Sequence, residues 1–213
     1  MSSARRARRQ VRESRALGLV LTPKAAKYFD RRPFPPGAHG RGRRRTESDY
    51  AIRLREKQRL RAQYGLREKQ IVRAFQDAKK EDGLTGEALV ELLEMRLDSL
   101  VMRSGLARTI FQARQTVVHR HVLVDGKLVD RPSFRVKPGQ VVMIKPKSQV
   151  LVPFQVAAAG AHRDAQRNAN LWQTPDYLDV NLERLRFELV RRPKRSEVPV
   201  TCDVQLVVEH YSR

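Results

Sequence analysis

The sequence predicts an α+β fold, in which a basic helical amino-terminal domain precedes a small α/β module. Apolar residues recur at helical spacing through the middle of the chain, with charged residues between them. Short apolar runs follow, separated by Asp-Gly and Lys-Pro-Gly turn signals that are typical of antiparallel strands. We therefore expect the module to combine two successive helices, arranged like a helix-turn-helix pair, with antiparallel strands.

The beginning of the chain is its most basic part. Residues 1–60 hold eighteen Lys and Arg against five Asp and Glu. Arginines at this density lack counter-charge, so we expect residues 1–45 to be an extension that a partner orders. The Pro- and Gly-rich segment 31–40 is either an extended path along a phosphate backbone or a solvated linker. The candidate contacts in this extension are Arg5, Arg6, Arg8, Arg9, His39, Arg43, Arg44 and Arg45.

The net charge and the single cysteine limit the class of partner. A formal net charge of +21 favours a polyanion, because each neutralised phosphate releases counterions; a merely soluble basic surface is the alternative. No apolar run reaches the ~20 residues that span a bilayer, and no hydrophobic segment follows the basic start. We therefore expect a cytosolic protein without membrane contact. Cys202 alone cannot form an intramolecular disulfide or a four-cysteine metal site.

Two helices are predicted within a helical domain over residues 46–93. Thr46 and Asp49 have capping-box spacing, and the helix that they begin runs to Gly65. The segment 66–80 has the apolar residues of a second helix that packs against the first. Basic residues cover most of the first helix, which favours a helix with its exposed side against a polyanion. Its candidate contacts are Arg53, Arg55 and Arg59.

The helices of the module are predicted next. A leucine-rich stripe predicts one helix over residues 85–103, with Arg96 and Arg103 projecting from its flanks. A second helix begins at Thr109, whose hydroxyl caps it while Gln112 reaches back in a capping-box arrangement. The candidate contacts of the module are Arg96, Arg103, Arg108, Arg114, His119, Arg120, His121 and Lys127.

Strands are predicted to complete the module, which we place over residues 94–156. Three short apolar runs are separated by two turn signals, which indicates antiparallel pairing. The runs are 122–124, 127–129 and 141–144, and the turns are Asp125-Gly126 and Lys137-Pro138-Gly139.

Residues 157–213 are expected to form a segment that completes the two domains. Small and polar residues over 157–170 predict a short helix, and Trp172 and Tyr177 are predicted core anchors. Alternating residues over 198–208 predict a closing strand.

Two sets of motifs carry a family resemblance. The first set is Arg96-Leu97-Asp98, Gln112-Ala113-Arg114-Gln115, His119-Arg120-His121, Val124-Asp125-Gly126-Lys127 and Pro132-Ser133-Phe134. It resembles the RNA-binding domain named after small-subunit ribosomal protein S-four, which also occurs on pseudouridine synthases, a tyrosyl-tRNA synthetase and small stress proteins. The second set is Arg31-Arg32-Pro33-Phe34-Pro35-Pro36-Gly37-Ala38-His39-Gly40, Leu54-Arg55-Glu56-Lys57-Gln58, Tyr64-Gly65 and Val208-Glu209-His210-Tyr211-Ser212-Arg213. With it, nearly the whole chain resembles the bacterial family of that ribosomal protein.

The resemblance implies a structural, non-enzymatic component of the ribosome that binds small-subunit (16S-type) ribosomal RNA early and helps to nucleate assembly of the subunit body. It also implies a place near the messenger RNA channel, beside ribosomal protein S-five, where their contact influences decoding accuracy. Carried onto matching positions, the family's RNA contacts are His39, Arg43, Arg44, Arg55, Arg96, Arg103, Arg108, Arg114, His119, His121 and Lys127.

The resemblance also bears on metal binding. Many family members hold zinc with four cysteines near the amino terminus, where this chain has none. We therefore expect no zinc and no other cofactor, with the amino-terminal loop held by packing and RNA instead. His119 and His121 would point to opposite faces of a strand, which disfavours a metal site there as well.

Other interpretations keep the RNA partner but change the activity. An RNA-modifying enzyme needs a catalytic domain, yet outside the module the sequence has no glycine-rich phosphate loop, His-x-Glu pair or Gly-x-Ser-x-Gly elbow. A translational repressor that binds messenger RNA would use the same surfaces. Arg96 and Asp98 are expected to lie too close on one helix to face each other, so a carboxylate elsewhere and a phosphate are equal candidates for Arg96. Few aromatics lie among the basic segments, which favours recognition of backbone and shape over base stacking.

Overall fold

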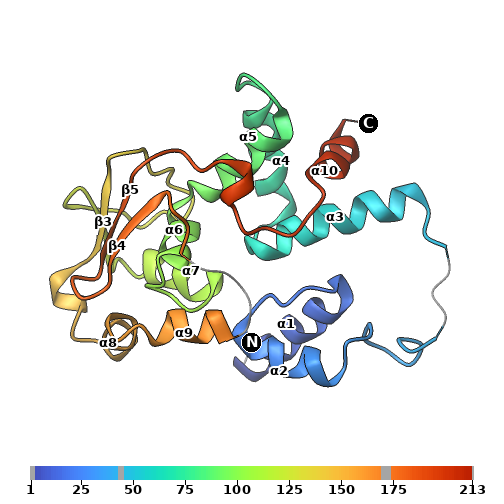
Figure 1. The fold of residues 1–213 in the computed structure, drawn as a ribbon, viewed down its shortest axis with the longest axis horizontal. Coiled ribbons are helices and arrows are strands. Elements are labelled where there is room, and N and C mark those ends of the chain that lie inside the picture. Colours follow the sequence, from blue (N-terminus) through green and yellow to red (C-terminus); the bar gives the residue numbers. More distant parts are fainter. Residues whose placement is uncertain (1–2, 43–45, 169–173, 213) are drawn as a thin grey trace.

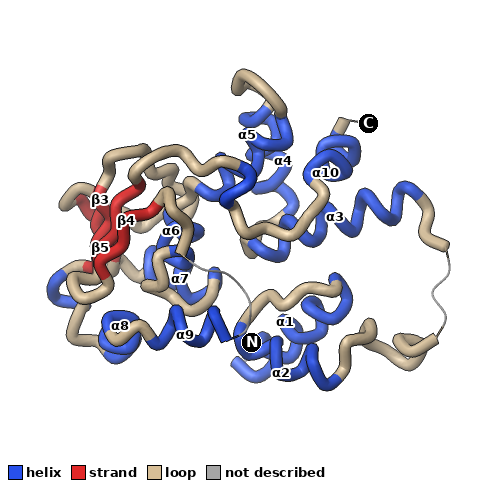
Figure 2. Tube along the Cα trace, in the orientation of Figure 1, coloured by secondary structure: helices blue, strands red, loops and turns tan. Residues whose placement is uncertain are grey.

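The computed structural model describes residues 3–42, 46–168 and 174–212, and it confirms the predicted α+β class. In Figure 1 the strands lie at the left, several helices lie at the upper right, and the first two helices lie below them. Figure 2 shows that the strands are confined to one end of the molecule. One continuous hydrophobic core joins the upper helices to the sheet, from Leu60 through Leu100 to Phe187.

The arginine-rich start of the chain forms two helices in the structure, and its ordering by a partner stays a prediction. α1 (Ser3–Leu17) ends at Gly18, whose φ of 67° leaves the right-handed helical region. Arginine and alanine are good helix formers, and a helix spreads their charges around its girth. α2 (Pro23–Arg31) follows, capped by Thr22, whose Oγ1 accepts a hydrogen bond from the Ala25 amide. The two helices pack against each other.

The helical pair predicted after residue 46 is confirmed, with a later start. Ser48 caps the first helix by accepting a hydrogen bond from the Ala51 amide, so the capping box predicted at Thr46 is wrong. Gly65, with φ 59°, follows the end of this helix as predicted. A third helix packs against the second. These helices are α3 (Asp49–Gln63), α4 (Glu68–Ala78) and α5 (Thr85–Glu94).

The single helix predicted over residues 85–103 is wrong, because the chain breaks at Arg96 into α5 and α6 (Leu97–Arg103). Arg96 has an extended backbone, with φ −67° and ψ 142°. The break lets the chain bond to a distant segment: the Leu97 amide donates to the Phe134 carbonyl oxygen at 2.8 Å. A leucine stripe continues across the break, so the sequence pattern alone does not reveal it.

The closing strand predicted over residues 198–208 is also wrong, because this stretch leads into the helix α10 (Val204–Tyr211). Asp203 caps the helix, and its carboxylate accepts hydrogen bonds from the amides of Gln205 and Leu206. The valines of the stretch fit helical spacing as well as alternation. α10 packs on α3 and α5, which closes the helical side of the core.

The described residues form a five-stranded antiparallel sheet in the order β2-β1-β3-β5-β4. Asp125 and Gly126 join its first two strands, and both have positive φ (48° and 77°), as the predicted Asp-Gly turn requires. The β4–β5 hairpin, which the sequence analysis missed, pairs with β3. The strands are β1 (Val122–Val124), β2 (Lys127–Leu128), β3 (Val141–Ile144), β4 (Leu178–Asn181) and β5 (Arg186–Leu189).

The second helix of the module is confirmed, and α6 packs against it. The Thr109 hydroxyl accepts a hydrogen bond from the Gln112 amide at 3.2 Å, as predicted, but the Gln112 side chain accepts one from the Arg108 amide and not from the Thr109 amide that a capping box would use. The helix predicted over 157–170 is part of a pair of short helices that Gly160 separates. The remaining helices are α7 (Ile110–Val118), α8 (Val152–Ala158), α9 (Ala161–Asn168) and the 3-10 turns η1 (Pro146–Ser148) and η2 (Arg195–Glu197).

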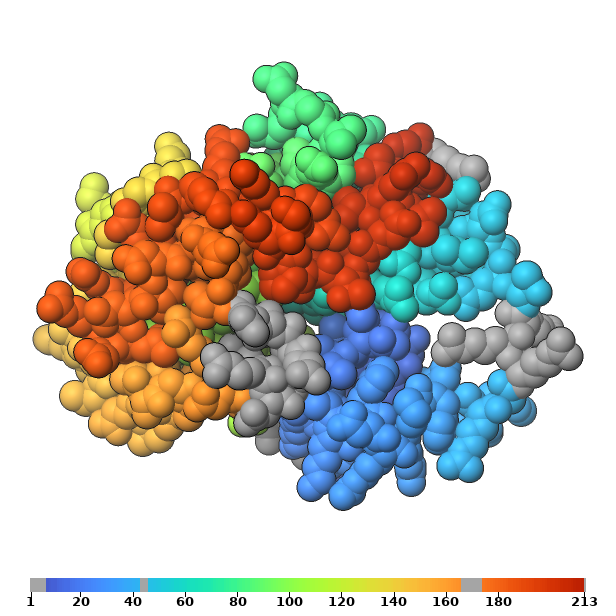
Figure 3. All heavy atoms as spheres, viewed as in Figure 1, coloured from blue at the N-terminus to red at the C-terminus, as the bar shows by residue number. Residues whose placement is uncertain are grey.

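The carboxyl-terminal residues contribute to both ends of the molecule. Figure 3 shows their orange and red surface running from the side of the sheet to the upper helices. Tyr177, a predicted core anchor, is fully buried, whereas Trp172 lies outside the described residues. Within the described residues, no helix is both long enough and apolar enough to cross a membrane.

Candidate nucleic-acid interface

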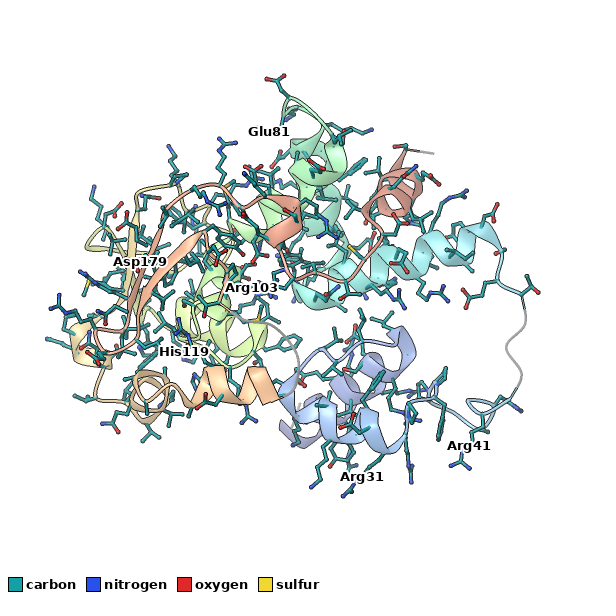
Figure 4. All side chains as sticks on the ribbon, viewed as in Figure 1. Arg31, Arg41, Glu81, Arg103, His119 and Asp179 are labelled. Atoms are coloured by element: carbon teal, nitrogen blue, oxygen red, sulfur yellow. The ribbon has the colours of Figure 1, made fainter. Side chains whose placement is uncertain are left out.

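Among the predicted contacts on α1 and in the module, six described side chains are exposed, and they come from three parts of the chain. Exposed arginine and lysine side chains can reach phosphates from the protein surface. Figure 4 labels one of the six, His119, beside α7. The residues are Arg8 and Arg9 on α1, Arg108, His119 and Arg120 on either side of α7, and Lys127 on β2.

A cleft of about 620 Å³ lies between α1, α7 and the junction of α3 with α4. Basic side chains from all three regions line it, so the cleft concentrates positive potential between low-dielectric walls. Two carboxylates, Glu13 and Glu68, also line it. Arg61 and Arg67 are not among the contacts predicted from the sequence, although their positions on either side of Gly65 place them at a helix junction. The basic residues of the lining are Arg9, Arg61, Arg67, Arg114 and His119.

Arg114 is held at the edge of this cleft by three partners. Its Nη1 donates to the Gly65 carbonyl oxygen at 2.6 Å, and its Nη2 donates to the Tyr64 carbonyl oxygen at 3.2 Å. Nη2 also donates to Asp98 Oδ2 at 2.8 Å. These bonds tie α7 to the end of α3. The side chain stays about a quarter exposed (28%), so one edge of the guanidinium still faces the cleft.

Arg96 is bound to Asp98, which corrects the expectation that the two side chains cannot face each other. Its Nε and Nη2 donate to the two carboxylate oxygens at 3.0 Å each. The pairing is possible because Arg96 precedes α6 and is not part of a helix. Asp98 is fully buried and Arg96 nearly so. The prediction that Arg96 projects outward is therefore wrong.

Arg103 is buried against Glu94, so the prediction that it projects from a helix flank is also wrong. Its Nε and Nη2 donate to the Glu94 carboxylate at 2.5 and 3.2 Å. The phenols of Tyr64 and Tyr177 donate to the same carboxylate, each at 2.6 Å. Figure 4 shows Arg103 among the crowded side chains between the sheet and the upper helices.

The charge of Glu94 is stabilised by these donors. Burial alone would raise the pKa of Glu94, but the Arg103 charge and the hydrogen bonds from Arg103, Tyr177 and Tyr64 outweigh it and lower the pKa below its ordinary value. Burial and the adjacent carboxylate raise the pKa of both tyrosines, so both phenols keep the protons that they donate. The cluster joins α3, α5, α6 and the segment before β4 around one carboxylate.

The basic side chains predicted as contacts on α3 are each paired with a carboxylate of the protein. Arg53 pairs with Glu209 of α10 at 2.9 Å, and Arg55 pairs with Glu47. Arg59 donates to Glu56 at 2.7 Å and to the Leu17 carbonyl oxygen of α1 at 3.0 Å. α1 and α10 pack on this helix, and Arg61 is the arginine of α3 that lines the cleft; RNA contact by Arg53, Arg55 and Arg59 stays a prediction.

The two histidines beside α7 lie near each other instead of on opposite faces of a strand. Their ring centroids are 6.1 Å apart, because His119 caps α7 and His121 precedes β1. His121 Nδ1 lies 2.9 Å from Ser148 Oγ, and its ring meets the edge of Phe154. Burial, followed by electrostatic repulsion from the His119 ring and Lys145, lowers the pKa of His121. Among the described residues, no group of three or more possible metal ligands comes together.

The remaining predicted contacts lie at the amino end of the chain. Arg5 and Arg6 belong to α1. His39 is exposed in the loop after α2, and its carbonyl oxygen accepts a hydrogen bond from the Gly42 amide at 3.0 Å. Arg43, Arg44 and Arg45 lie outside the described residues.

Two family models match this chain in succession. The model "Ribosomal protein S4/S9 N-terminal domain" matches residues 5–94, and the model "S4 domain" matches residues 95–142. The chain belongs to the ribosomal protein S4 family. The two matches meet at Glu94, the carboxylate that the buried cluster surrounds.

Individual members of the S4 family are similar to this chain over its length. "Small ribosomal subunit protein uS4" of Beutenbergia cavernae is 76% identical over 213 residues, which is all of both chains. The protein of the same name from Arthrobacter sp. is 66% identical, also over all of both chains. That of Leifsonia xyli is 65% identical over 97% of this chain and 98% of its own.

Proposed function

We propose that this S4-family protein is a structural component of the small ribosomal subunit and acts there by binding ribosomal RNA. Its relatives carry the name of a small-subunit protein over their full length, and an RNA partner fits the net charge of +21. The proposed activity is binding, without catalysis of a reaction.

The observation that carries the proposal is how the basic residues divide between internal pairs and the α1–α7 cleft. Arg53, Arg55, Arg59, Arg96 and Arg103 are paired with carboxylates inside the protein. Other basic side chains remain open along the cleft or beside it. RNA contact at this cleft would use Arg9, Arg61 and Arg67, together with the exposed edge of Arg114, whose other bonds hold Asp98 and the end of α3.

The proposed contact surface follows from this division. We leave Arg96 and Arg103 out, because exposing them would break buried ion pairs. We keep the predicted extension residues, with Arg43, Arg44 and Arg45 as candidates outside the described part of the chain. The surface consists of Arg5, Arg6, Arg8, Arg9, His39, Arg108, Arg114, His119, Arg120, His121 and Lys127, with Arg61 and Arg67 added from the cleft.

Finer roles extend the same proposal. An early binder that joins several RNA helices would help to nucleate assembly of the subunit body, and the continuous core gives it the rigidity for that task. A position beside ribosomal protein S-five and near messenger RNA would let it influence decoding accuracy in a cytoplasmic ribosome. The division of the chain into an extension (1–45), a helical domain (46–93), the RNA-binding module (94–156) and a carboxyl-terminal segment (157–213) remains a prediction.

The test is binding of the purified protein to the 5′ domain of small-subunit ribosomal RNA, in competition with excess transfer RNA at near-physiological salt. Retained binding is expected if the cleft recognises a folded site. Loss of binding to the competitor would contradict the proposal, because it would mean that the charge acts without specificity. Sedimentation of the protein in cell extracts is the second measurement: a structural component co-sediments stoichiometrically with small subunits, whereas a free repressor or enzyme does not.

A further inference from the structure

Arg15, near the end of α1, binds the backbone of the loop that follows α2. Its Nε donates to the Arg32 carbonyl oxygen at 3.0 Å and to the Phe34 carbonyl oxygen at 3.1 Å. Its Nη2 lies 3.5 Å from the Pro35 carbonyl oxygen. The Arg15 guanidinium therefore lies against three backbone carbonyl groups of a loop that is about twenty residues away in sequence.

The Phe34 ring adds a second contact to the same guanidinium. The central carbon of the Arg15 guanidinium lies 5.1 Å from the ring centroid, and that of Arg41 lies 4.7 Å from it. Both distances are within the range of a cation–π interaction. Phe34 thus links a residue of α1 to a residue at the far end of the loop.

The composition of the loop explains why it needs an outside donor. Pro33, Pro35 and Pro36 have no amide proton, so this stretch cannot satisfy its carbonyl groups with a regular backbone ladder. A planar guanidinium offers several donors in fixed directions and can stack on a ring, which a lysine ammonium cannot reproduce. The site therefore requires arginine specifically, and not only a positive charge.

The end of α1 is itself fixed, which gives Arg15 a defined position. The neighbouring Ser14 is fully buried. Its Oγ accepts a hydrogen bond from the Leu21 amide at 3.3 Å, and its carbonyl oxygen accepts one from the Leu19 amide at 3.0 Å. Farther along the loop, turns close from the Gly40 amide to Gly37 and from the Gly42 amide to His39.

We propose that Arg15 and Phe34 are positioning residues that hold the loop 32–42 on α1 and thereby present His39 and Arg41 to RNA. Arg15 then acts through the loop and does not itself contact a phosphate. Before Cys202 the chain has no cysteine with which to cross-link this region. The contacts of Arg15 and Phe34, which we call the clasp, hold the loop on α1 by hydrogen bonds and ring stacking instead. The presentation of the loop to RNA rests on the proposed function, but the clasp itself does not.

The first test uses the free full-length protein and measures hydrogen exchange of the Gly40 and Gly42 amides. Arg15→Lys keeps the charge and removes the guanidinium fork, and Arg12→Lys makes the same change at an exposed position of α1. Exchange should be faster by about tenfold or more in Arg15→Lys, which corresponds to the loss of charge-assisted hydrogen bonds. It should be unchanged in Arg12→Lys. Wild-type exchange in Arg15→Lys, at an unchanged thermal midpoint, would overturn the proposal.

The second test is a double-mutant cycle of Arg15→Lys with Arg41→Ala, read as affinity for the ribosomal RNA fragment. Each single change should weaken binding by about tenfold. The double variant should bind about as well as the weaker single variant, because Arg15 acts through the residue already removed. Additive losses, or full affinity in Arg15→Lys, would overturn the positioning role. If wild-type protein lacks specific binding, the proposed function fails, while hydrogen exchange still decides whether the clasp exists.

Discussion

Tyr177 and Glu94 lie 83 residues apart in sequence and are joined by a hydrogen bond of 2.6 Å. The phenol belongs to the segment that leads into β4, and the carboxylate ends α5. Tyr64 from the end of α3 and Arg103 from α6 bind the same carboxylate. The helical side and the sheet side of the protein are therefore locked together at the point where the two family models meet.

Glu94→Gln should lower the free energy of unfolding by about 3–5 kcal/mol, because it leaves the buried Arg103 guanidinium without a counter-charge. Urea unfolding at pH 7 measures the change. Glu91→Gln is the matched control, since Glu91 pairs with Arg192 at the surface, where the ion pair contributes less than about 1 kcal/mol. Equal effects of the two substitutions would show that the cluster does not hold the fold.

The contribution of Glu94 to stability should depend on pH. Its pKa in the folded protein lies below the ordinary value of 4.5. The stabilisation is therefore fully present above pH 4.5 and is lost as the pH falls through the lower folded pKa. The stability difference between wild type and Glu94→Gln should be constant from pH 7 to about 5 and should shrink in more acidic solution. A difference that grows with acid would contradict the sign of this shift.

The Cys202 thiol should react slowly in the native protein. Burial raises its pKa to about 11, so almost none of it is thiolate near pH 8. A thiol-specific chromogenic disulfide should react with native protein slower by about a hundredfold than with protein unfolded in urea. Equal native and unfolded rates would contradict burial of the thiol.

Arg9→Ala should reduce the salt dependence of RNA binding. If Arg9 neutralises one phosphate in the cleft, the slope of log affinity against log salt falls by about one unit. Lys80→Ala removes the same charge from the exposed turn that follows α4, next to Glu81, which Figure 4 labels. The control should leave the slope unchanged. Equal slopes for the two variants would place RNA contact away from the cleft.

Local signals in the sequence predicted local structure well. The Thr109 hydroxyl caps its helix through the Gln112 amide, and Asp125 and Gly126 adopt the positive φ values that their turn requires. Both features depend on neighbouring residues only, so short sequence patterns contain them.

Features that depend on residues far away in the sequence could not be predicted from short sequence patterns. Arg96 leaves the helical pattern because its backbone meets Arg135, and Arg103 is buried because Glu94 lies opposite it. An arginine on a helix flank can reach water, RNA or a carboxylate, and only the folded chain decides among these. The β4–β5 hairpin was not predicted because its strands are short and because β5 pairs with β3, which is distant in the sequence.

The carboxyl-terminal segment also sets the order in which a newly made chain can finish folding. Synthesis delivers α1 and the arginines of its exposed side first, whereas β4, β5 and α10 emerge last. Until they arrive, one edge of β3 is unpaired, α3 lacks the packing of α10, and Glu94 lacks one of its two phenol donors. The basic amino end is thus available to an RNA before the rest of the protein has become rigid.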